Sequence, residues 1–333
     1  MPIRVAHQRT QMTLLLTALV AVSLVSLLVG AGEVGPLRSL AALAGTQDSD
    51  ASFVVWQLRA PRTLIGIAVG MALGVAGALL QAVSRNPLAE PGLLGVSAGA
   101  AFAVALTLVM GASAATLRIS VAQLGALVGC LCVLSVTRVR GVGSDPVRLV
   151  LAGAAFSGLL GSLTSLMLLY DQRAADEIRF WVIGSLAGRR LDDLAAMLPS
   201  MLVAAVAVVL MARPLAALAL GERAASGLGH HPGLIRWCVV ACVALLVGGA
   251  TAMAGPIAFV GLVVPFVARA MAGPDIRRTL WFCLSIGPLM VLAADMIARV
   301  AVAPSELPIG VLTALCGAPV LVAVVRARRL PSL

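Results

Sequence analysis

The sequence predicts an all-α polytopic membrane protein, with about ten transmembrane helices that form a single domain over residues 1–333. Hydrophobic residues make up 61% of the chain and charged residues only 11%, well below the roughly 25% that is typical of soluble domains. Long uncharged runs alternate with short polar loops. Because a helix needs about 20 apolar residues to cross the hydrocarbon core, most of these runs are long enough to span a membrane.

Each uncharged run is expected to form one helix. In chain order the runs cover residues 12–29, 63–83, 93–110, 119–136, 149–169, 194–211, 237–253, 255–268, 280–294 and 307–325. The eighth run is short and contains Pro256 and Pro265, which would leave backbone groups unpaired in lipid. We therefore expect a broken helix there, or a helix packed against the rest of the protein.

Three polar intervals between the runs carry information. Residues 30–62 are expected to form a loop on the outer side of the membrane, and residues 170–193 an outer segment with a short surface or re-entrant helix over 178–186. Residues 215–228, on the cytoplasmic side, are expected to form one or two short amphipathic helices. These helices should be broken at Gly221 and should end at the glycines that follow it.

The arginines predict which side of the membrane each loop occupies. Loops on the N-terminal side hold 15 of the 24 arginines and four acidic residues, whereas the other side holds nine arginines and ten acidic residues. Cytoplasmic loops carry the excess of basic residues, so both termini are expected in the cytoplasm. Treating the first run as a cleaved signal peptide would make the number of spans odd and the arginine bias inconsistent. The net charge of +10 thus reflects topology, and nucleic-acid binding is not expected.

Several function classes are disfavoured by the residues themselves. The chain has no lysine and so cannot form the P-loop that binds ATP phosphates, which places any ATP hydrolysis on another chain. Asp295 is the one charge that lies clearly among apolar residues, whereas an ion-coupled secondary transporter is expected to need several. No arrangement of Ser, His, Cys or Asp suggests a catalytic centre. Cys238 and Cys242 share a helix face without further ligands, so no metal site is expected.

Glycines at regular spacing predict close helix packing. Four of them follow one face of the second run, and two further pairs repeat the pattern in the third and fourth runs. They are Gly66, Gly70, Gly74 and Gly77, then Gly95 with Gly99 and Gly125 with Gly129. Small residues on one helix face let another backbone approach closely, so these helices are expected to form a tight bundle.

Five short motifs carry a resemblance to a known family. They are RAPRTL at 59–64, RNPLAEPGLLGVS at 85–97, GPIAFVGLVVP at 255–265, ELPIG at 306–310 and GAP at 317–319. In this order and spacing they resemble the FecCD permease family, the membrane subunits of type II ABC importers for ferric siderophores, haem and cobalamin. The resemblance covers the chain from about residue 50 to its end.

The resemblance implies a type II ABC importer permease fold in the bacterial inner membrane. It also implies a complex with a second permease subunit, identical or related, two ATPase subunits and a periplasmic substrate-binding protein. ATP and magnesium would bind the ATPase, and this chain would hold no cofactor or metal. Residues 176–189 look more like siderophore members, although the wording of residues 89–92 also occurs in the cobalamin branch. A purely structural scaffold would not need the gate and coupling elements that follow.

The resemblance also assigns candidate site residues. A cytoplasmic gate is expected at Asn86 and Leu88, facing Asp145, Pro146 and Val147, at the end of a pathway lined by the fifth and tenth runs. ATPase coupling is assigned to Leu220, Gly221 and Glu222 within residues 215–228. Where the family commonly has histidine, this chain has Phe266, so any role of that histidine cannot be carried over.

Docking of the binding protein is assigned to Arg59, Arg62 and Arg299. All three lie at the predicted outer ends of spans, where the positive-inside rule gives no reason to find arginine. Each matches a position at which the cobalamin member presents an arginine to its binding protein. Two alternatives remain open, namely interfacial anchoring and, for Arg299, an intrahelical pair with Asp295.

Overall fold

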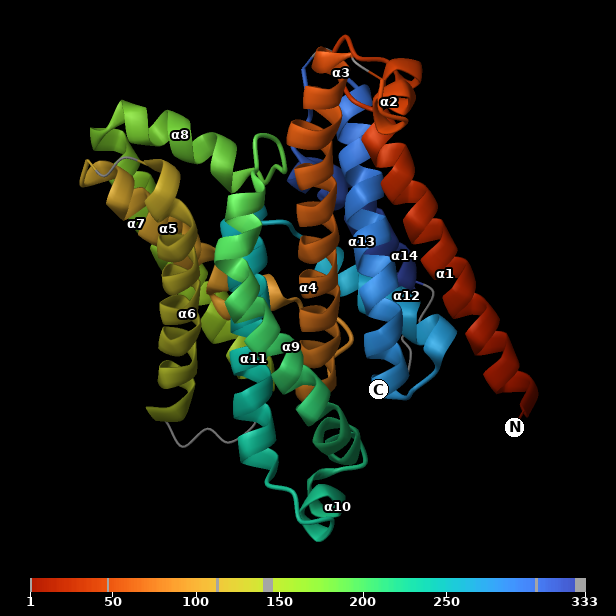
Figure 1. Ribbon diagram of the computed structural model, residues 1–333. Coiled ribbons are helices and arrows are strands. Elements are labelled where there is room, and N and C mark those ends of the chain that lie inside the picture. The colour runs from red at the N-terminus through yellow and green to blue at the C-terminus, as the bar shows by residue number, and fades with distance from the viewer. Residues whose placement is uncertain (1, 47, 112–113, 140–145, 303–304, 327–333) are drawn as a thin grey trace.

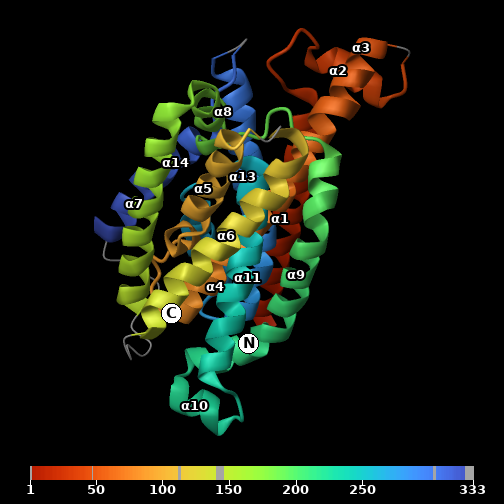
Figure 2. The same ribbon diagram turned by 90° about the vertical axis from the view of Figure 1, so that its left-hand side faces the viewer.

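The computed structural model describes residues 2–46, 48–111, 114–139, 146–302 and 305–326, and every regular element in these ranges is a helix. In order they are α1 (Pro2–Leu28), α2 (Pro36–Leu43), α3 (Ser49–Phe53), the π-helix η1 (Val54–Arg59), α4 (Ala60–Ser84), the 3₁₀ helix η2 (Pro91–Leu94), α5 (Val96–Val109), α6 (Ala114–Val139), α7 (Pro146–Tyr170), α8 (Gln172–Val182), α9 (Leu191–Ala219), α10 (Glu222–Gly227), α11 (Pro232–Ala254), α12 (Val260–Ala272), α13 (Ile276–Val300) and α14 (Ile309–Arg326). The long helices form a bundle with α2, α3 and α8 at one end and α10 at the other (Figures 1 and 2). We call these the α8 end and the α10 end.

Each of the ten apolar runs coincides with a helix, which confirms the all-α prediction. In the described ranges six helices are long and apolar enough to cross a membrane, in α1, α3–α4, α7, α9, α11 and α13. Four shorter apolar helices cover Val96–Val109, Ile119–Ser135, Val260–Ala272 and Ile309–Val322. The chain is therefore a multi-pass membrane protein, and a count of about ten crossings stays a prediction.

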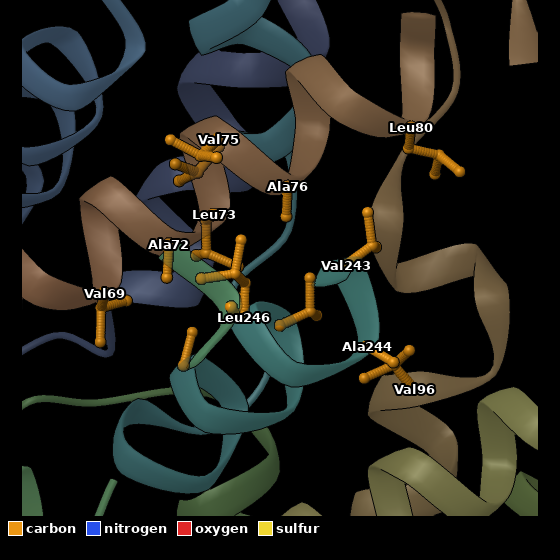
Figure 3. Packing of buried hydrophobic residues seen from close by; sticks show 14 of the residues in the cluster. Val69, Ala72, Leu73, Val75, Ala76, Leu80, Val96, Val243, Ala244 and Leu246 are labelled. Carbon is orange, nitrogen blue, oxygen red and sulfur yellow. The ribbon is translucent and has the colours of Figure 1, made fainter. Parts of the chain in front are cut away.

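The core of the bundle is built around α4 and α11. Of the most apolar window in each of these helices, 78% is buried inside the chain, against 6% for α1 and 11% for α7. Figure 3 shows Val69, Leu73 and Ala76 of α4 among the α11 side chains Val243 and Leu246. Because lipid is as apolar as leucine, this packing depends on close contact rather than on escape from water.

The glycines of α4 make that contact possible, as their spacing predicts. A Cβ atom on Gly70 would overlap the backbone of Gly287 in α13, and one on Gly77 would overlap the carbonyl oxygen of Gly261 in α12. Gly99 of α5 meets Gly125 of α6 in the same way. These contacts confirm the tight packing expected from the sequence.

The structure corrects two predicted segments, the loop expected over 30–62 and the short helices expected over 215–228. Residues 30–62 are mostly helical, because α2 covers Pro36–Leu43 and because α3 and η1 continue into α4 without a break; the Asp48 side chain starts α3 by accepting from the Ala51 N–H at 3.1 Å. Residues 215–219 belong to the long helix α9, which continues through Pro214, so only α10 is a separate short helix. The break at Gly221 is confirmed, and so is the end of the helix at Gly227.

The two expected irregular helices are present. α8 is the short helix of the 170–193 interval, although it begins at Gln172 rather than at 178. α12 begins only at Val260, after a non-helical stretch from Gly255, and its first six residues are buried. Neighbouring helices thus supply the packing that its prolines require.

Candidate functional site

The predicted gate residues lie in a tight turn that follows α4, which we call the 85–91 turn. Arg85 ends α4 in a left-handed conformation, with φ of 50°. The Asn86 side chain accepts from the Leu88 N–H at 2.9 Å, and the Ala89 N–H donates to the Asn86 carbonyl at 3.1 Å. Asparagine at this position closes the turn with its own side chain. Leu88 is left 37% exposed at the tip of the turn.

Phe266 lies beside this tip. Pro87, Leu88 and Phe266 line a small pocket, completed by residues of α12 and α14, with a volume of about 10 Å³. This volume is about the minimum that one water molecule needs, so the contact is nearly dry. The position at which the chain departs from the family pattern therefore adjoins the predicted gate.

A partly buried carboxylate joins the 85–91 turn to the start of α12. Glu90 Oε1 accepts from the Phe259 N–H at 2.8 Å, and Phe259 has a left-handed φ of 67°. Such a backbone conformation is unfavourable for a bulky residue and persists only where its surroundings hold it. Burial raises the pKa of the Glu90 carboxyl, and the hydrogen bond from Phe259 acts in the opposite direction. Pro91 packs directly against Gly261 of α12.

Gln81 and Arg269 form a second link between the same elements. Gln81, fully buried in α4, donates to the carbonyls of Ala89 at 3.3 Å and Leu262 at 3.4 Å. Its Oε1 accepts from Arg269 Nη2. We use the name α10-end network for Gln81, Arg269 and the 85–91 turn, which includes Glu90.

The sequence reasoning overlooked these three side chains. Arg269 could have been found, because it stands among apolar residues at 267–271 with no acidic neighbour. Gln81 and Glu90 offer no comparable signal, since their partners are backbone groups of distant segments.

The predicted coupling residues lie at the α9–α10 junction. Leu220 is 75% exposed, and Gly221 has a φ of 119°, which strongly favours glycine. Glu222 pairs with Arg236 of α11. Arg85 Nη2 donates to the carbonyl of Leu218, the penultimate residue of α9, at 2.9 Å. The coupling residues and the 85–91 turn are therefore in contact through one hydrogen bond.

The other side of the predicted gate is only partly visible. Asp145 lies outside the described residues. Pro146 and Val147 begin α7, and nothing is known of their side-chain contacts. The gate assignment, like the coupling assignment, stays a prediction.

A larger hollow of about 710 Å³ opens on α14. It lies between α14, the end of α8 and the non-helical stretch before α12. Its lining is apolar and consists of Val182, Ile183, Pro256, Ala258, Gly310, Val311, Ala314, Leu315, Ala318 and Pro319. The tenth apolar run thus contributes one wall of a groove, and a pathway lined by the fifth and tenth runs stays a prediction.

The three predicted docking arginines are buried at the α8 end, with 5% of Arg59, 8% of Arg62 and 1% of Arg299 exposed. Arg62 binds Asp295 through Nε and Nη2, at 2.9 and 2.7 Å from Oδ1, and binds Glu306 through Nη1 at 2.7 Å. Asp295 also pairs with Arg299, one turn further along α13. The alternative of an Arg299–Asp295 pair is thereby confirmed.

Arg59 and Arg299 also cap the C-terminus of α1. Arg59 Nη1 donates to the carbonyls of Leu27 and Leu28 at 3.1 and 2.9 Å. Arg299 Nη1 donates to those of Ser26 and Val29 at 2.9 and 3.2 Å. The last carbonyls of a helix lack intrahelical partners and carry partial negative charge, so two cations satisfy them well.

These five charged residues and the α1 carbonyls are called the α8-end network. Their contacts explain why arginines occur where the positive-inside rule does not expect them: the partners are a buried carboxylate and a helix end. Docking through these three arginines stays a prediction, and their intramolecular contacts leave little of each guanidinium for a partner protein.

Within the described ranges, no group of three or more His, Cys, Asp or Glu side chains could hold a metal ion. All six cysteines are free thiols, and burial keeps Cys130, Cys242 and Cys283 from solvent. The expectations of no metal, no cofactor and no catalytic residue in this chain stay predictions.

Comparison with known proteins gives consistent matches over the whole chain. The model of the FecCD transport family matches residues 18–327. The ferric enterobactin transport system permease protein FepD of Escherichia coli is 42% identical over 314 residues, 94% of this chain and 93% of that protein. The hemin transport system permease protein HmuU of Yersinia pestis is 35% identical over 311 residues, 92% of this chain and 93% of that one. A metal-chelate type ABC transporter solved in an inward-facing conformation superposes with a TM-score of 0.83 at 28% identity, over 96% of this chain and 99% of that one.

Proposed function

The chain belongs to the FecCD transport family, and we propose that it is the permease subunit of an ATP-driven importer that moves a ferric siderophore chelate from the periplasm to the cytoplasm. The observation that carries this proposal is the 42% identity to a ferric enterobactin permease along almost the entire chain. A haem importer is the alternative, since the hemin permease covers the chain as completely, and the cobalamin branch shares several motifs.

The absence of lysine, the apolar groove on α14 and the arginine distribution support the proposed complex. Without lysine it cannot bind ATP through a P-loop, which supports a complex in which two separate ATPase subunits bind ATP and magnesium. A second permease subunit, identical or related, would complete the pathway beside the apolar groove on α14. The arginine bias supports an orientation with both termini and the α10 end in the cytoplasm, and with the α8 end towards a periplasmic binding protein.

The contacts at the α10 end support a mechanical route from ATPase to gate. The exposed α9–α10 junction is the surface available to an ATPase, and Arg85 joins it to the 85–91 turn. Displacement of the junction would therefore move the turn that carries Asn86 and Leu88. Gating by shifts of packed helices needs one such contact between the moving element and the pathway.

Uptake of an iron chelate by cells tests the substrate class. Cells that lack their own permeases for these substrates are given this chain together with its partner subunits and are supplied with an iron-labelled tricatecholate chelate, iron-labelled haem or cobalt-labelled cobalamin. We expect uptake of the tricatecholate chelate alone. Uptake of haem or cobalamin in its place would favour the corresponding alternative, and uptake of none of the three would reject all of these substrates.

A further inference from the structure

We propose that Gln81 and Arg269 position the cytoplasmic gate: Arg269 fixes the orientation of the Gln81 carboxamide, which then holds the 85–91 turn against α12. This inference rests on the proposed gate at Asn86 and Leu88, and assigns a role to two residues that do not themselves line it.

The chemistry of the three groups permits one arrangement. A guanidinium can only donate, so Arg269 requires the oxygen of the Gln81 side chain on its side. The amide nitrogen must then point the other way, where the carbonyls of Ala89 and Leu262 accept its two protons. A rotated carboxamide would set a donor against Arg269 and an oxygen against two carbonyls.

Burial makes this arrangement strong enough to matter. Gln81 has no exposed surface, Ala89 is 1% exposed and Arg269 is 6% exposed, so water cannot replace a lost hydrogen bond. Nε and Nη1 of Arg269 find no partner among the described residues. Among the described residues, Gln81 is thus the hydrogen-bond partner of this buried cation.

The Gln81 contacts complete a double connection between the turn and α12. Ala89 is held by Gln81, and Glu90 is held by the Phe259 N–H. Gly77 of α4 also touches the Gly261 backbone one helical turn before Gln81. The 85–91 turn should therefore move with α12 as one body. A displacement of the α9–α10 junction that reaches the turn through Arg85 would then also move α12.

Gln81→Glu separates this role from simple packing. Glutamate keeps the size of the side chain and strengthens the contact with Arg269, so folding is favoured. It cannot donate, however, and places negative charge against the two carbonyls. The turn should therefore detach from α12 while the bundle stays intact.

The measurement is the rate of maleimide labelling of a cysteine at position 88. All six native cysteines are removed, and the complex with its ATPase is labelled with and without a non-hydrolysable ATP analogue. In the parent we expect two different rates. In Gln81→Glu we expect labelling without nucleotide to rise on the order of tenfold, as for two lost hydrogen bonds, and the difference between the two states to disappear.

Two further variants complete the test. Gln123→Glu makes the same change in α6, where Gln123 donates to Ser200 at 2.6 Å, and should leave both rates unchanged. Arg269→Met frees the carboxamide to rotate and should give a smaller rise than Gln81→Glu.

Each outcome decides between the two proposals. State-dependent labelling in the parent that Gln81→Glu and Arg269→Met leave unaltered would overturn the positioning role and keep the gate. Equal rates in both states of the parent would overturn the gate itself, and with it this inference.

Discussion

The two ends of the bundle hold buried arginines in opposite ways. In the α8-end network Arg62 and Arg299 share Asp295, and Arg59 and Arg299 bind four consecutive carbonyls of α1. In the α10-end network Arg269 has one neutral partner, and Arg85 reaches one carbonyl. Each arginine of the first set makes several hydrogen bonds or ion pairs, whereas among the described residues each arginine of the second set makes a single hydrogen bond.

This difference agrees with the roles proposed for the two ends, docking at the α8 end and gating at the α10 end. Ion pairs with several hydrogen bonds at low exposure resist rearrangement, because separating them leaves uncompensated buried charge. The hydrogen bond from the exposed Arg85 to Leu218 exchanges at low cost, whereas the buried contacts of Gln81 and Arg269 hold the 85–91 turn to α12. We infer that the α8 end holds α1, α4 and α13 together while the α10 end rearranges during transport.

Asp295→Asn tests the α8 end most severely. It leaves two buried guanidinium groups facing one neutral amide, and breaking a buried pair in this way costs about 3–5 kcal/mol. We expect a large fall in the midpoint of thermal unfolding of the detergent-solubilised protein, or failure to accumulate in the membrane.

Glu306→Gln is the matched control for that change. Its side chain is 30% exposed and pairs with Arg62. Because exposed pairs contribute little, its unfolding midpoint should stay close to the parent value. Equal losses in both variants would show that Asp295 has no special place in the α8-end network.

Gly77→Ala tests the helix that joins the two ends. The new methyl group would overlap the Gly261 carbonyl, so α4 and α12 must separate, at a cost of about 1–3 kcal/mol. Gly233→Ala in α11 meets no atom within 4 Å and should be neutral or slightly stabilising. Comparable unfolding midpoints for the two variants would contradict the close contact between α4 and α12.

The sequence predicted the helices well because apolar runs and glycine spacing are local signals. All ten runs are helical, and the glycines of α4 face α12 and α13 as their common face requires. The exceptions are informative. The 30–62 interval contains Gly, Ser and Asp, which are typical of loops. The same residue types also occur at helix starts, as Gly35 does before α2 and Asp48 before α3.

The site was harder to predict, because its contacts join segments far apart in the chain. Motifs marked Asn86, Gly221 and the three outer arginines, and helical spacing marked the Arg299–Asp295 pair, but the partners on other segments were not marked. Arg62 lies 233 positions before Asp295, and Gln81 lies 181 positions before Leu262. Nothing local to Arg59 indicates that it caps a helix ending at Leu28.

Arg85→Ala addresses the α10 end, where function should change more than stability. The variant loses one hydrogen bond to Leu218 from an exposed side chain, so unfolding should shift by less than about 1 kcal/mol. Chelate uptake should fall several-fold while ATP hydrolysis by the complex continues. Arg277→Ala, exposed at the start of α13, should leave both activities unchanged. Parallel loss of uptake and hydrolysis would place Arg85 in assembly rather than in transmission.

Glu306→Gln also gives the gentlest test of whether the α8 end docks a binding protein. If Arg62 takes part in docking, Glu306 competes with the acidic groups of the partner, and its neutralisation weakens the attraction for one guanidinium nitrogen without disturbing Asp295. Affinity for the binding protein at low salt should then rise about two- to fivefold, in line with an exposed ion pair. Asp192→Asn removes an exposed carboxylate paired with Arg190, at 3.2 Å, and corrects for the general effect of charge. An equal rise in both variants would leave Arg62 with its intramolecular role alone, because steering by net charge would then account for the whole effect.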